Sequence, residues 1–195
     1  MKKLLVFSIF VVSFIFVNAQ KIDTLKFTSA EVCSGKGAVT SGLYSYASFE
    51  NKKYSFMVTL SNQDNEVTFL RKLFREMLVG ANAGYFFNVP YVGPQIIFSP
   101  FKFLTTFHWL GYALGAPGEN VNAPIFLFNV QQVNFNFYKF TAAYTLIHYM
   151  DNLPQNVASF KYTGKINRNF SCYSEVGYDF TKNDQLLKLG IVYKK

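Results

Sequence analysis

Residues 155–195 read QNVASFKYTGKINRNFSCYSEVGYDFTKNDQLLKLGIVYKK and contain three short segments in which apolar and polar residues alternate. The last segment places Leu187 and Leu189 on one face and Lys188 on the other. Successive side chains of a β-strand point to opposite faces, so this alternation is typical of a strand with one apolar face. The turn-forming residues between the segments therefore predict three antiparallel strands.

The same pattern recurs upstream. Residues 54–60 alternate between large apolar residues and the set Ser55, Met57 and Thr59. Residues 133–137 also alternate before the apolar positions change parity near Tyr138, which predicts a bulge or a turn there. Residues 83–114 form the most apolar region, with Lys102 as the one ionised side chain. Prolines and glycines divide this region into pieces shorter than the about 18 residues of a membrane helix. It therefore predicts short strands rich in Phe, Ile and Tyr.

Residues 66–79 break the pattern. Apolar residues recur there at helical spacing, with Arg71, Lys72, Arg75 and Glu76 on the opposite side. Asp64 or Asn65 stands where a helix N-cap is expected. The stretch predicts one short amphipathic helix, lying on a membrane interface, closing one end of a barrel or packing on a sheet.

The first residues predict export. Lys2 and Lys3 precede an apolar run, 4–17, and small residues end at Ala19. This is the anatomy of a secretory signal peptide, 1–19, so residues 20–195 are expected to form a single β-barrel domain. The whole chain carries a formal charge of +8, but no Lys/Arg-rich block points to nucleic acid. Attraction to an anionic membrane surface is a simpler explanation of the charge. A charge with no partner-specific role is simpler still.

Many amphipathic strands with short turns predict an all-β fold, an antiparallel up-and-down barrel. Eight transmembrane strands fit the length, and ten or more are compatible with it, because each tilted strand needs about 9–11 residues. Alternation alone does not say whether the apolar face points outward to lipid or inward to a ligand. In a filled eight-stranded barrel a cluster of complementary charges would face the interior. Its members are Lys161, Glu175, Asp179 and Lys188.

The end of the chain bears on that choice. A polar residue, a glycine and alternating apolar residues lead to an aromatic residue in 188–193. This stretch resembles the terminal strand of Gram-negative outer-membrane β-barrels, with Lys188, Gly190 and Tyr193 as the candidate insertion signal. The resemblance implies a place in the cell outer membrane, with outer-membrane lipid and the barrel-insertion machinery as partners.

No residue pattern points to catalysis, a metal or a cofactor. His108 and His148 are the only histidines, and neither has a Cys or a second His at ligand spacing. A lipid A-modifying barrel enzyme with a Ser–His pair would need a serine near His148, and the neighbouring residues supply none. Cys33 and Cys172 are compatible either with one disulfide bond or with two free cysteines.

Two main hypotheses remain for function. The first is a non-enzymatic outer-membrane barrel with a structural or surface-interaction role and an unknown surface partner. The second is a soluble periplasmic barrel that binds an apolar ligand. The two differ in which face of the strands meets the barrel interior.

Overall fold

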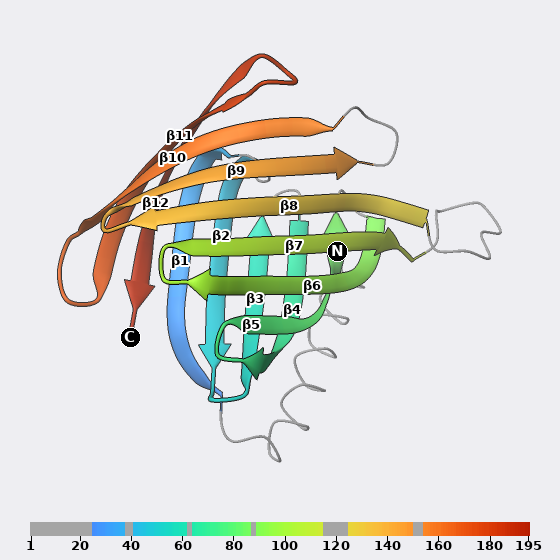
Figure 1. Cartoon of the computed structure of the whole chain (residues 1–195), viewed down its shortest axis with the longest axis horizontal. Helices are drawn as coiled ribbons and strands as arrows, with labels where there is room; N and C mark the ends of the chain where they lie inside the picture. Colours follow the sequence, from blue (N-terminus) through green and yellow to red (C-terminus); the bar gives the residue numbers. More distant parts are fainter. Residues whose placement is uncertain (1–24, 38–40, 62–63, 87–88, 115–124, 150–153) are drawn as a thin grey trace.

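The computed structural model describes residues 25–37, 41–61, 64–86, 89–114, 125–149 and 154–195. These residues form a closed antiparallel barrel in which each strand pairs with its neighbours in the chain and β1 pairs with β12. The strands are β1 (Lys26–Lys36), β2 (Ser41–Glu50), β3 (Tyr54–Ser61), β4 (Asp64–Phe74), β5 (Met77–Phe86), β6 (Val89–Phe101), β7 (Leu104–Ala113), β8 (Ile125–Phe137), β9 (Phe140–Tyr149), β10 (Gln155–Lys165), β11 (Phe170–Asp179) and β12 (Asp184–Lys194). Figure 1 shows how the strands curve around to form the wall of the barrel.

The prediction of an all-β, antiparallel up-and-down barrel is confirmed, but the number of strands is wrong. The barrel has twelve strands rather than eight. Most connections are only two to five residues long, and residues 114–124 make the longest one. The eight-stranded expectation assumed several long loops, and the chain uses those residues for additional strands.

The helix predicted near 66–79 is also wrong. Its residues form the end of β4, the turn at Arg75 and Glu76, and the start of β5. Phe69 faces outward and Leu70 is fully buried inside, so two adjacent apolar residues serve opposite faces of the wall. A register shift between Lys72 and Phe74 then changes the parity before the turn. The bulge and the turn together imitate helical spacing.

The three strands predicted from 155–195 are present as β10, β11 and β12. The parity change near Tyr138 is a two-residue turn between β8 and β9, where Tyr138 has a φ of +52°. Among the residues described, no helix is long and apolar enough to cross a membrane.

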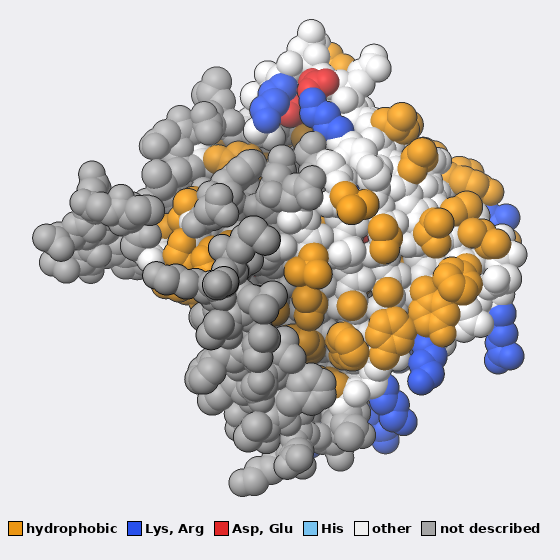
Figure 2. All heavy atoms as spheres, turned by 180° about the vertical axis from the view of Figure 1, so that it is seen from behind, with side chains coloured by type: hydrophobic (Ala, Val, Ile, Leu, Met, Phe, Trp, Pro, Cys, Tyr) orange, Lys and Arg blue, Asp and Glu red, His pale blue; other side chains and the backbone are white. Residues whose placement is uncertain are grey.

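The apolar face of the strands points outward. Large apolar side chains cover the outer wall, as the orange surface of Figure 2 shows. Leu187, Leu189 and Ile191 of β12 are each more than half exposed, whereas Leu186 of the same strand is buried inside. Because an apolar outer wall is stable only against lipid, the soluble alternative, which needs this face inside, is not supported.

Candidate functional site

The lumen has two unlike walls, and the first of them is charged. It lies on β1, β2, β10, β11 and β12. Tyr173 of β11 lies at its centre, and its hydroxyl donates a 2.6 Å hydrogen bond to Oε1 of Glu31 on β1. The Lys161 ammonium of β10 lies 3.6 Å from the centre of the Tyr173 ring. One aromatic ring thus joins a carboxylate at its hydroxyl to a cation on its face, and this wall is ordered by charge.

The predicted interior charges partly come together on this wall. Glu175 lies opposite Lys161 in the pairing of β10 with β11, and opposite Lys188 in the pairing of β11 with β12. Nζ of Lys188 lies 5.2 Å from the centre of the Tyr44 ring. The structure therefore places Lys161, Glu175 and Lys188 side by side, on three neighbouring strands.

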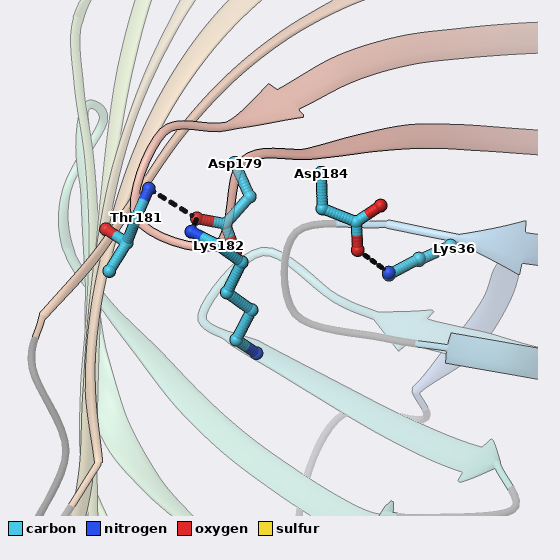
Figure 3. A network of polar contacts seen from close by, with 5 residues as sticks. All are labelled: Lys36, Asp179, Thr181, Lys182 and Asp184. Carbon is cyan, nitrogen blue, oxygen red and sulfur yellow. Dashed lines mark hydrogen bonds and ion pairs between the residues drawn. The ribbon is translucent and has the colours of Figure 1, made fainter.

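Asp179 lies apart from them. It is four residues beyond Glu175, which is about 13 Å along the strand. Its carboxylate accepts hydrogen bonds from the backbone N–H groups of Thr181 and Lys182, at 2.9 and 3.1 Å (Figure 3). Asp179 thus orders the turn between β11 and β12, and the structure does not bring it together with the other three charges. Alternation predicts which face of the strand a side chain occupies, but it does not predict the position of that side chain along the barrel axis relative to other strands.

One more carboxylate faces the lumen, on the other side of the barrel. Glu66 of β4 is buried and accepts hydrogen bonds from the Thr68 hydroxyl at 2.6 Å, the Tyr91 hydroxyl at 2.6 Å and the Asn82 amide at 3.3 Å. Three donors from β4, β5 and β6 converge on one acid. Such convergence supplies the hydrogen bonds that a buried carboxyl group requires.

The second wall is aromatic and lies on β6 to β9. Five buried residues pack together inside the barrel: Tyr91, Trp109, Phe128, Val130 and Ile147. The rings of Trp109 and Phe128 meet edge to face, with centroids 4.6 Å apart, and Tyr91 meets Phe128 at 5.1 Å. This arrangement is the favoured geometry of aromatic pairs. The wall is therefore a packed apolar core that lies inside a membrane barrel.

Each wall seats one aromatic ring over a glycine. A Cβ on Gly190 would lie 2.4 Å from the ring of Tyr173, and a Cβ on Gly111 would lie 2.4 Å from the ring of Phe128. Both pairs are cross-strand neighbours in the register. Only a residue without a side chain leaves room for these rings to lie flat against the wall.

A cavity of about 360 Å³ lies between the two walls. Lys188, Glu175 and Tyr44 line it on the charged side, and Trp109 and Phe107 line it on the aromatic side. Further polar side chains in its lining are Tyr46, Thr59, Glu66, Thr68, Gln95 and Gln132. This volume lies within the range of about 300–1,000 Å³ that small-molecule sites occupy.

The residues of the predicted insertion signal lie on β12. Lys188 and Gly190 face the lumen, and Tyr193 faces outward, where its ring lies 5.0 Å from Phe170 and 5.8 Å from Phe27. Gly190 thus has a packing role inside the barrel in addition to any role as a signal. The predicted signal peptide, 1–19, lies outside the described residues.

The residues considered for chemistry lie apart from one another. His108 and His148 are both exposed on the outer wall, in β7 and β9. His108 lies opposite Gln131 and His148 lies opposite Asn129 in the register. Cys33 is buried on the lumen side, Cys172 is exposed, and both are free thiols.

The aromatic wall and two of the lumen carboxylates were not predicted from the sequence. Glu66 was hidden by the predicted helix, and Glu31 lies in a segment whose alternation is weak at its start. The aromatic wall did leave a signal. In residues 91–113 apolar residues occupy both odd and even positions, so both faces of the strands there carry apolar side chains. In a barrel that faces lipid, an apolar second parity indicates an apolar lumen.

Comparison with known proteins gives the fold. No protein-family model matches the sequence, and no curated protein does either. Among solved structures, the KdgM porin superposes with a TM-score of 0.50 at 12% identity, covering 87% of this chain and 99% of that one. The NanC porin has a TM-score of 0.48 at 14% identity, covering 86% and 99%. The chain has the fold of an outer-membrane porin.

The apolar outer wall agrees with that fold. A closed barrel satisfies every backbone hydrogen bond within the sheet, and so it can cross a bilayer without an exposed edge. The prediction of an outer-membrane β-barrel, made from the alternation, the predicted signal peptide and the terminal strand together, is confirmed.

Proposed function

We propose that this barrel is a non-enzymatic, porin-like protein that passes small polar solutes through its lumen. The observation that carries the proposal is the partly open cavity of about 360 Å³ in the lumen, which is lined by charged, amide and hydroxyl side chains as well as by apolar ones. Eight-stranded barrels are filled by their own side chains, and barrels of 16–18 strands hold wide channels. A twelve-stranded barrel lies between the two, so its pathway is expected to be narrow.

The lining supports a preference for solutes of low net charge. Glu66 is already held by three donors, which leaves Lys188 and Glu175 as the charged groups offered to a solute. These two lie on adjacent strands and oppose each other in sign. Amides and hydroxyls supply the remaining hydrogen bonds, and the rings of Trp109 and Phe107 provide an apolar surface.

Conductance across a planar bilayer tests the proposal. We expect the purified, folded protein to produce small steps of current in salt solution. Replacing Lys188 with Gln removes one of the two lysines that lie opposite Glu175 and the one that lines the cavity, so the permeability ratio should shift toward cations. The matched control is Lys182→Gln, because Lys182 is exposed in the turn between β11 and β12 and outside the cavity.

A folded, heat-modifiable barrel that carries no current would overturn this function. It would then favour the structural or surface-interaction role that the sequence had predicted. Current with unaltered selectivity in Lys188→Gln would place the solute path away from the cavity.

A further inference from the structure

Lysines and arginines gather at one end of the barrel, the end at which β1 begins and β12 ends. They lie at the start of β1, at the end of β12, and in or beside the turns that join β2 to β3, β4 to β5, β6 to β7, β8 to β9 and β10 to β11. All of them are exposed. We call this set the basic collar: Lys26, Lys52, Lys53, Arg71, Lys72, Arg75, Lys102, Lys139, Lys165, Arg168, Lys194 and Lys195.

Acidic residues do not balance the collar. Among the described residues, Glu50 and Glu76 are the acids at that end. The opposite end is different, because Lys36 forms an ion pair with Asp184 there and Asp179 lies in the same region (Figure 3). On the face seen in Figure 2, blue side chains lie along the lower right, whereas red appears only at the top, beside blue.

Outward aromatic rings lie next to the collar. Phe101 and Phe103 stack at 5.2 Å on the two sides of the turn that holds Lys102. Tyr138 is 99% exposed, and Nζ of Lys139 lies 5.5 Å from the centre of its ring. Aromatic residues on the outer wall mark the level of the membrane interface. The collar therefore lies at the level of the lipid headgroups.

We propose that the basic collar binds the headgroups of anionic phospholipids in the leaflet that surrounds this end of the barrel. The charges occur at every turn of that end, around the whole circumference, and a membrane is the partner that surrounds a barrel on all sides. A protein partner would require a concentration on one side. The collar end has the short turns, which in outer-membrane barrels face the periplasm. Basic residues beside an anionic leaflet are each strongly attracted to it.

Lipid retention by the full-length protein tests this inference. The protein is reconstituted in nanodiscs of phosphatidylcholine mixed with phosphatidylglycerol, and native mass spectrometry counts the lipids that stay bound. We expect phosphatidylglycerol to be enriched over its share in the disc. The enrichment should fall at about 1 M salt, where the Debye length is about 3 Å. This readout is independent of conductance, so failure here leaves the proposed function untouched.

The main variant replaces six collar residues that lie in turns with Gln: Lys52, Lys53, Arg75, Lys102, Lys139 and Arg168. Enrichment should fall at least about five-fold, because one basic residue near an anionic surface already contributes roughly that factor. A matched pair compares Lys52→Gln/Lys53→Gln with Lys36→Gln/Lys182→Gln, which removes the same charge at the other end.

Heat-modifiability on gels verifies that each variant is folded. Enrichment that is equal in the wild-type protein and the six-residue variant overturns the proposal. So does enrichment that the Lys36/Lys182 variant loses as strongly as the collar pair. Tight binding of soluble polyglutamate without any lipid enrichment would also overturn it, in favour of an acidic polymer.

Discussion

The two walls of the lumen hold their side chains in place by different interactions. The charged wall orders its side chains through a cation over a ring and a hydroxyl bound to a carboxylate, at Lys161, Tyr173 and Glu31. The aromatic wall packs Tyr91, Trp109 and Phe128 edge to face and buries them almost completely. Each wall nevertheless seats one ring over a glycine of the neighbouring strand.

The difference shows how a twelve-stranded barrel can be both stable and partly open. A barrel of this size encloses more space than side chains fill, so packing on one side supplies stability while the other side stays polar. We therefore expect substitutions in the aromatic wall to affect stability most. Substitutions in the charged wall should affect solute passage more.

The largest expected effect is that of Phe128→Ala. Phe128 is 1% exposed and contacts two aromatic neighbours, so its loss should lower the free energy of unfolding by about 3–5 kcal/mol. Urea unfolding of the barrel in lipid, followed by the gel shift, measures it. Phe135→Ala on the same strand is the control, because Phe135 is 40% exposed and faces lipid. Equal losses in the two variants would contradict an internal core.

In each wall a ring packs against a glycine, so the same Gly→Ala substitution can be compared between the two walls. In Gly111→Ala and Gly190→Ala the new Cβ would collide with the ring of Phe128 or Tyr173, which should cost about 1–3 kcal/mol in each case. Gly111→Ala should cost more, because its ring belongs to the packed core. Gly164→Ala is the control, since its nearest contact would be an ordinary 3.6 Å. A larger loss in Gly190→Ala would reverse the ranking of the walls.

The smallest expected effect is that of Lys161→Met. This change keeps the aliphatic stem and removes the cation that lies 3.6 Å from the Tyr173 ring centre. The loss of stability should be about 1 kcal/mol, measured by the same unfolding transition. Lys165→Met, at the exposed end of β10, should change stability less. A loss of unfolding free energy as large as that of Phe128→Ala would show that the charged wall stabilises the fold as much as the aromatic wall does.

The candidate site was only partly predictable. Alternation pointed to Lys161, Glu175 and Lys188, because they alternate with exposed apolar residues in the clearest strands, and the register brings these three together. Glu31 and Glu66 were missed, because each reaches the lumen from a segment where alternation was weak or misassigned. The aromatic wall was missed, because the apolar region 83–114 was interpreted only as short strands, with no inner and outer face assigned to them.

Alternation in the sequence determined that the chain forms antiparallel strands, because side chains of a strand point to opposite faces with a period of two. The terminal strand also indicated the class of membrane barrel. Only the tertiary structure decided the number of strands, since the turn at Arg75 and Glu76 and the bulge before it carry the apolar spacing of a helix. It also decided which residues share a height in the lumen. That depends on register between strands, and hydrogen bonding between distant segments sets the register.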